Sequence, residues 1–161
     1  SLKMKKLSLY LVLVLVLFSY NIAQTQSSFP DCQGDDYKKW TNCYGKATFS
    51  SGDIYVGEFY NGHEHGQGTL TFLNGSIHIG QFKDGKFYGY GTHISADGRK
   101  YVGQWENGTH NGQGTLTETN GDQYVGKFKR GYFHGLGTFT FADGTIDKGI
   151  WRKGKLIIRL Y

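Results

Sequence analysis

The stretch that decides the fold is "YVGEFYNGHEHGQGTLTFLNG", residues 55–75. Taken alone it resembles a functional site, because His63-Glu64-His65 could hold a metal ion and "GQG" is typical of part of a phosphate-binding loop. Comparison at steps of 23 residues gives another interpretation. The glycines and aromatic residues recur in register along the chain, whereas the triplet does not. The recurring residues therefore indicate a scaffold, and the triplet is its variable part.

Four columns of residues define the 23-residue period. The first is mostly aromatic and holds Tyr55, His78, Tyr101, Tyr124 and Asp147. The second is glycine throughout: Gly57, Gly80, Gly103, Gly126 and Gly149. The third is aromatic throughout: Phe59, Phe82, Trp105, Phe128 and Trp151. The fourth is again glycine: Gly62, Gly85, Gly108, Gly131 and Gly154. So regular a period indicates tandem copies of one supersecondary unit.

Each copy also contains two turn signals. One set of Asn-Gly or Asp-Gly pairs lies at 61–62, 84–85 and 107–108, and the other at 74–75, 97–98, 120–121 and 143–144. These pairs predict two-residue hairpin reversals, so each copy should hold two short strands centred on "YVGEF" and "GTLTF". The chain shows no helical period. We therefore predict an all-β fold, a single-layer antiparallel β-meander solenoid of tandem 23-residue β-hairpin repeats.

Alternation along each strand predicts which residues share a face of this sheet. Tyr55, Gly57 and Phe59 fall on one side of their strand, and Val56 and Glu58 fall on the other. The first set predicts a packed face of aromatic rings over glycine gaps, because glycine lets a neighbouring ring approach closely. The opposite face should be polar.

The N-terminal segment is typical of an export signal. Translation is expected to begin at Met4, where two lysines precede an apolar run from Leu9 to Phe18. The alternative is an uncleaved membrane anchor, which the short run disfavours. The predicted organisation is then a signal peptide at 1–23, a cysteine-containing cap and degenerate copy at 24–54, four full copies at 55–146, and a partial copy or C-terminal edge at 147–161.

The two cysteines, Cys32 and Cys43, lie close together after the predicted leader. An even number of cysteines in an exported chain predicts one disulfide, and two free thiols are the alternative. Two cysteines with no nearby histidine do not indicate a metal site. Other catalytic or cofactor motifs are missing from the sequence, so we expect no cofactor, no metal and no enzymatic activity.

Charge is distributed unevenly along the chain. Without Lys3, Lys5 and Lys6 of the predicted leader, 15 basic and 13 acidic residues give a balance of only +2, which does not favour nucleic-acid binding. Residues 124–161, however, carry 8 basic and 2 acidic side chains. Adjacent hairpins should gather the following cations into one patch: Lys127, Lys129, Arg130, Lys148, Arg152, Lys153 and Lys155. Such a patch suits an anionic lipid head group, a polysaccharide or an acidic protein.

The C-terminal cations have an alternative explanation, and the chain contains one further candidate site. Lysine and arginine are common on the edge strands of sheets, where they discourage aggregation, so the C-terminal cations have a structural explanation too. Threonines recur at 69, 71, 115, 117, 138 and 140, and such a ladder can present an ordered array to water, ice or glycan. Threonine is also an ordinary exposed strand residue, and other strands should lie between these rungs.

The columns resemble the MORN (membrane occupation and recognition nexus) repeat. The matching segments are "YVGEFYNGHEHGQG", "HIGQFKDGKFYGYG", "YVGQWENGTHNGQG" and "YVGKFKRGYFHGLG". The resemblance implies a binding or assembly module that contacts membranes, phospholipids or proteins, or associates with itself. We therefore expect an exported, non-enzymatic interaction scaffold, secreted or at the periplasm or cell envelope, that binds a protein or an envelope surface. A membrane module that binds anionic phospholipid through the basic C-terminal patch is the alternative.

Overall fold

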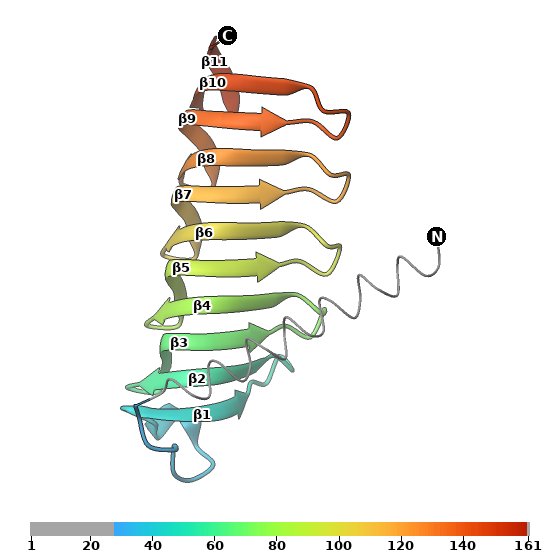
Figure 1. Ribbon diagram of the computed structural model, residues 1–161. Helices are drawn as coiled ribbons and strands as arrows, with labels where there is room; N and C mark the ends of the chain where they lie inside the picture. Colours follow the sequence, from blue (N-terminus) through green and yellow to red (C-terminus); the bar gives the residue numbers. More distant parts are fainter. Residues whose placement is uncertain (1–27, 161) are drawn as a thin grey trace, which may run out of the picture.

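The computed structural model describes residues 28–160, so the predicted leader lies outside the described residues. The described chain forms one antiparallel sheet whose eleven strands follow one another in chain order (Figure 1). After a short 3-10 helix, η1 (Tyr37–Lys39), come β1 (Cys43–Thr48), β2 (Ile54–Tyr60), β3 (His63–Thr71), β4 (Ile77–Lys83), β5 (Lys86–Ile94), β6 (Lys100–Glu106), β7 (Thr109–Thr117), β8 (Gln123–Lys129), β9 (Tyr132–Thr140), β10 (Ile146–Arg152) and β11 (Lys155–Arg159). The predicted all-β meander of hairpins is confirmed.

The turns that join β2 to β3 and their equivalents have the predicted two-residue form. Asn61 and Gly62 both have positive φ angles, 49° and 73°. Positive φ at both central positions defines a type I′ turn, whose twist matches that of the flanking strands. The same geometry recurs at Asp84-Gly85 and Asn107-Gly108, and even Arg130 and Lys153 adopt φ of 50° and 49°.

The turns that join successive copies differ from the prediction. Gly75 N donates to Phe72 O and Phe72 N donates to Ser76 O, both at 2.9 Å, which encloses the three residues 73–75. Gly75 alone has a positive φ, 89°, so this is a type I turn followed by a left-handed glycine. The prediction of a two-residue reversal is wrong here. The Asn74 side chain explains the difference, because its Oδ1 accepts the Ser76 N–H at 2.9 Å and favours the longer loop.

A bulge bends the hairpin within each full copy across its middle, whereas the strands that join successive copies pair without one. Gly57 pairs with Gly68, but the next pair along β2 and β3 is Glu58 with His65, so two residues of β3 have no partner on β2. Bulges of this kind turn the strand locally. The turn end of each hairpin consequently folds towards the aromatic face, and rings from both sides of the bend meet. Tyr124 and Phe133, for example, stack with centroids 3.8 Å apart.

The aromatic face holds the core, as the alternation predicts. A Cβ added to Gly68 would lie 2.3 Å from Tyr55 Oη, so only glycine leaves room for the ring. The tyrosine hydroxyls also have partners, since Tyr101 Oη donates to Gln104 O at 2.9 Å. Buried residues of the first and third columns are Tyr55, Phe59, His78, Phe82, Tyr101, Trp105, Tyr124, Phe128 and Trp151. Edge-to-face ring contacts connect these columns along the array.

Candidate functional site

The predicted cations at the C-terminal end lie on the face opposite the rings. Alternation along β8 puts Lys127 and Lys129 on the side away from Tyr124 and Phe128, and Lys148 and Arg152 take the same side of β10. Lys155 pairs with Arg152 across the last hairpin, and Arg130 and Lys153 occupy the type I′ turns. We call the non-aromatic side of the sheet the outer face, and its part on β8–β11, with these two turns, the C-terminal outer face.

All seven of these cations are exposed. None of the ion pairs in residues 28–160 includes any of them. Nearby Arg159, in contrast, is paired with Asp147 at 2.6 Å. The positive charge of the C-terminal outer face is therefore not neutralised within the described chain and can attract an external anion.

Exposed apolar side chains, which were not predicted from the sequence, lie among the cations. Their exposed fractions are large for Val, Leu, Ile and Tyr: Val125 47%, Tyr132 58%, Leu136 56%, Ile150 36% and Ile158 54%. Strand register puts them on the outer face too, because Leu136 pairs with Ile150 and Ile150 with Ile158. The sequence does contain an indication of this apolar surface, because apolar residues stand at outer strand positions in the last copies. The surface thus combines cations with apolar groups.

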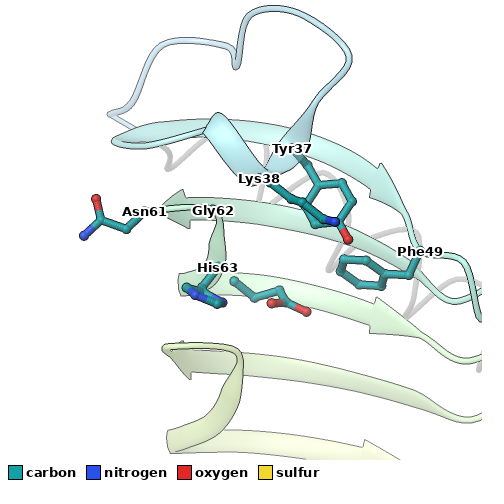
Figure 2. Close-up of a pocket in the computed structure, with 7 residues that line it drawn as sticks. Tyr37, Lys38, Phe49, Asn61, Gly62 and His63 are labelled. Atoms are coloured by element: carbon teal, nitrogen blue, oxygen red, sulfur yellow. The ribbon is translucent and has the colours of Figure 1, made fainter.

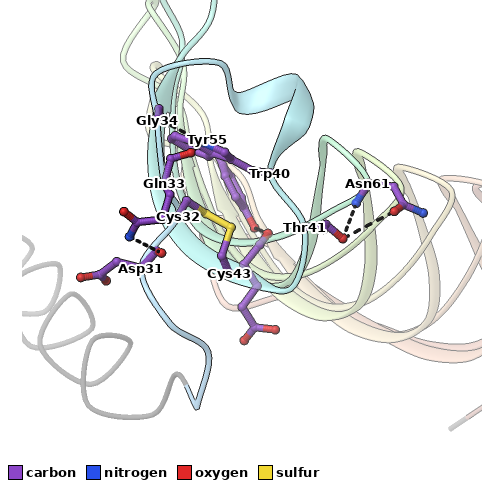
Figure 3. The surroundings of a disulfide bond; sticks show 10 residues. Asp31, Cys32, Gln33, Gly34, Trp40, Thr41, Cys43, Tyr55 and Asn61 are labelled. Atoms are coloured by element: carbon purple, nitrogen blue, oxygen red, sulfur yellow. Dashed lines mark hydrogen bonds between the residues drawn. A yellow bond between two sulfur atoms is a disulfide. The ribbon is translucent and has the colours of Figure 1, made fainter.

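The cap at the other end of the array covers the edge of β1 (Figure 3). A disulfide joins Cys32 to Cys43, and Asp31 forms an isolated bridge with Tyr44. Trp40 Nε1 lies 3.0 Å from the carbonyl oxygens of both Gln33 and Gly34, and the Trp40 ring meets Phe59 edge-to-face at 5.0 Å. The cap thereby extends the aromatic core beyond the first copy.

Removing the disulfide should measure what the cap contributes. For the double variant Cys32→Ser/Cys43→Ser we expect a loss of about 3 kcal/mol in the free energy of unfolding, because the bond closes a short loop in the unfolded chain. Urea unfolding followed by tryptophan fluorescence provides the measurement. The wild type under reducing conditions should show the same loss, and an unchanged midpoint in both samples would contradict this role of the cap.

The His63-Glu64-His65 triplet does not converge on one point. Alternation along β3 places His63 and His65 on the outer face and Glu64 on the aromatic face. His65 Nδ1 lies 3.6 Å from Asp84 Oδ1. Within residues 28–160, no group of three or more His, Cys, Asp and Glu side chains is arranged to hold a metal ion.

Glu64 occupies the place of a ring. The equivalent residues of the other copies are Phe87, His110 and Phe133, which stack on the first column at 3.6–3.8 Å. With a carboxylate there, a depression of about 420 Å³ opens beside the cap (Figure 2). It is lined by Tyr37, Lys38, Phe49, Asn61, Gly62, His63 and Glu64. Charges of both signs line it, so it has no clear preference for a ligand charge.

Three further histidines, His78, His93 and His110, belong to the aromatic core. His78 is fully buried and stacks on Phe87 at 3.6 Å, and His110 stacks on Tyr101 at 3.7 Å. Burial is the main cause that lowers the pKa of His78 to about 3 and the pKa of His110 to about 4, because an imidazolium would be poorly solvated there. Burial also lowers the pKa of His93. These side chains are neutral at pH 7 and act as rings.

Comparison with known families agrees with this architecture. The MORN repeat model matches residues 55–77, 78–98, 101–123 and 124–146. A search of curated proteins gives no match. Among residues 28–160, no helix has the length and apolar character needed to cross a membrane. The MORN repeat is a non-catalytic type of binding module, and its arrays bind proteins or membrane lipids. The period, the hairpin geometry and the four matched copies together show that this chain belongs to the MORN repeat family.

Proposed function

We propose that the protein is an exported, non-enzymatic scaffold that attaches to an anionic membrane or envelope surface through its C-terminal outer face. The ligand is the phosphate head group of anionic phospholipids. The observation that supports this most strongly is the cluster of seven cations that form no ion pair within residues 28–160, beside five exposed apolar side chains. The remainder of the array is then free to hold other proteins.

The composition of the C-terminal outer face fits a membrane surface better than a purely ionic partner. Each Lys or Arg near an anionic leaflet contributes about 1 kcal/mol, so four to seven cations suffice for stable attachment. Apolar side chains such as Leu136 and Ile158 can enter the boundary between head groups and acyl chains, and Tyr132 suits that boundary because its ring is apolar and its hydroxyl polar. A face with both kinds of side chain favours lipid.

Protection of a sheet edge does not account for all of the cations. That explanation applies to β11 and its neighbour β10, which carry Arg152 and Lys155. Lys127 and Lys129, however, lie on β8, and β9, β10 and β11 all lie between β8 and that edge. Their position supports a binding role for the face.

Two features support export. The disulfide between Cys32 and Cys43 is of a kind that persists in oxidising compartments outside the cytosol. The sequence that precedes the cap has the charge and apolar pattern of a secretory signal. Both features support an attachment site outside the cytosol.

Vesicle co-sedimentation with two matched variants tests this proposal. The patch variant changes Lys127, Lys129, Arg152 and Lys153 to Ser, and the control variant changes Lys46, Lys83, Lys86 and Lys100 to Ser, so both lose four positive charges. We expect the patch variant to bind phosphatidylserine vesicles at least about tenfold more weakly than the wild type, and the control variant to lose much less. Equal loss in both variants would show that total charge, and not the C-terminal outer face, determines binding.

An acidic protein is the second candidate ligand, since the same cations attract carboxylates. A pull-down from envelope extract distinguishes the two candidates. Recovery of a defined protein by the wild type but not by the patch variant, together with no binding to vesicles, would favour the protein ligand.

A further inference from the structure

The depression beside the cap has walls that the fold holds in place. The helix η1 rests on the turn between β2 and β3, where Gly62 N donates to Trp40 O at 2.7 Å. A Cβ added to Gly62 would lie 2.3 Å from Lys38 O, so only glycine lets the turn come this close to η1. The Asp36 carboxylate begins η1 by accepting the Lys38 N–H at 3.2 Å. The residues of η1 are therefore positioned before any ligand arrives, which lowers the entropy cost of binding.

Two aromatic rings form the apolar part of the depression. Tyr37 and Phe49 meet edge-to-face, with ring centroids 5.3 Å apart and planes at 80°. Both rings are only half-buried, so part of each remains open to a ligand. In Figure 2 these two rings and the Lys38 side chain lie on the same side of the depression, whereas the Asn61 side chain points away from it.

Three polar groups of the same depression have unused hydrogen-bonding capacity. Within residues 28–160, the Glu64 carboxylate, the Lys38 ammonium and Tyr37 Oη form no hydrogen bond or ion pair. Glu64 is half-buried, and its Oε2 would lie 3.3 Å from a Cβ added to Gly85 in the next turn. The carboxylate can accept hydrogen bonds, the ammonium can donate them, and the phenol hydroxyl can do both.

The mixture of charges excludes most simple ligand classes. An anion would lie close to Glu64, and a cation would lie close to Lys38. A wholly apolar ligand would remove both charged groups from water without replacing their hydrogen bonds, which is costly. A neutral ligand with several hydroxyl groups can satisfy both, because a hydroxyl donates to a carboxylate and accepts from an ammonium. The rings further require that such a ligand have an apolar face.

We propose that the depression beside the cap binds a neutral saccharide. A sugar ring has hydroxyl groups around its rim and C–H groups on its faces, so it combines the two properties that the depression requires. One face packs on Tyr37 and Phe49, while rim hydroxyls donate to Glu64 and accept from Lys38. The volume of about 420 Å³ lies in the range of about 300–1,000 Å³ that is typical of small-molecule sites. The site is a surface depression, so the bound sugar can also be one unit of a longer glycan.

Only the first copy can form this site. In the other three copies a ring of the chain itself, Phe87, His110 or Phe133, stacks on the first column where Glu64 stands here. The site also needs η1, which precedes the first copy alone. It lies at the end of the array away from the C-terminal outer face, so the saccharide proposal does not rest on the proposed membrane attachment.

An NMR titration of the ¹⁵N-labelled protein tests this proposal. The probes are glucose, galactose, mannose and N-acetylglucosamine, each added up to about 50 mM, because single sugars held by few contacts should bind with dissociation constants of about 1–10 mM. We expect at least one of these sugars to bind, with the largest amide shifts at residues 37–38, 49 and 61–64.

Two variants of one repeat position show whether the depression is the site. Glu64→Phe should weaken binding at least about tenfold, because the added ring fills the space that the sugar needs. Phenylalanine already stands at this position as Phe87 and Phe133, so the fold accommodates it. His110→Phe makes the same kind of change in the third copy and should bind as the wild type does. Lys38→Ala, at an exposed position, should weaken binding about threefold or more through the loss of a donor.

Four results would overturn the proposal. The first is the absence of shifts with all four sugars at about 50 mM. The second is a set of sugar-induced shifts that lies outside the depression. The third is a folded Glu64→Phe variant that binds as tightly as the wild type. The fourth is binding of free glycine or phenylalanine at the depression without binding of any sugar, which would assign the site to a zwitterion.

Discussion

Replacing Gly114 by alanine is expected to reduce the free energy of unfolding by about 3 kcal/mol. An added Cβ would lie 2.4 Å from Tyr101 Oη and 2.7 Å from two ring carbons of the same residue. Tyr101 is 2% exposed and cannot move aside, because His110 stacks on it at 3.7 Å and Trp105 and Phe128 meet it edge-to-face at 5.0 Å. The clash must therefore displace the core or bend the backbone.

Gly98→Ala is the matched control for this experiment. Gly98 has a φ of +95° and no atom within 4 Å of an added Cβ, so alanine meets backbone strain but no clash. We expect a loss of about 1 kcal/mol, smaller than for Gly114, whose φ lies outside the positive region. Thermal or urea unfolding of the two variants measures how much free energy of unfolding each one loses. If Gly114→Ala were no more destabilising than Gly98→Ala, the ring-over-glycine account of the core would be wrong.

Acid should destabilise the array through its buried histidines. The pKa of His78 is about 3 in the folded protein, against an ordinary value of 6.5. Between pH 6.5 and pH 3 the unfolded chain therefore binds a proton at this residue that the folded chain does not bind. Stability is therefore fully present above pH 6.5 and is lost as the pH falls below it. Between pH 6.5 and pH 4 we expect His78 alone to account for a loss on the order of 3 kcal/mol.

The variant His78→Tyr should remove this contribution. Both ring nitrogens of His78 are buried without hydrogen-bond partners, whereas a tyrosine hydroxyl in the same column donates to a backbone carbonyl, as Tyr101 does to Gln104. We therefore expect the variant to be more stable at pH 7 by about 1 kcal/mol and to lose less stability at pH 4. The reverse change, Tyr101→His, should increase acid sensitivity. Equal losses on acidification in wild type and His78→Tyr would contradict the role assigned to His78.

The repeat period predicts the strands well because each copy contains its own hydrogen-bonding and packing signals. Gly57 occupies a column that is glycine throughout and Phe59 one that is aromatic throughout, and the structure shows why, since the glycine makes room for a buried ring. The loop at Asn74 was harder to predict, because an Asn-Gly pair is compatible with two turn lengths and the Asn74 side chain decides between them. The bulge that bends the hairpin at Gly66 was not predicted. It leaves two residues unpaired, so the residues on either side of it alternate between the two faces as they would in a strand without a bulge.

The candidate site was only partly predictable. The cations could be named from the sequence because charge is explicit in it. The exposed apolar residues were not predicted, although Leu136 already falls at an outer position of its strand by alternation. Ile158 is placed on the outer face only by its pairing with Ile150.

The most direct test of the proposed function is the affinity of the wild-type protein for vesicles as the fraction of anionic lipid is raised from none to about one third. We predict negligible binding to neutral vesicles, a steep rise in affinity with anionic content, and a marked weakening when salt is increased. An affinity that is the same for neutral and anionic vesicles, or no binding to either, would contradict the assignment of the C-terminal outer face to an anionic membrane surface.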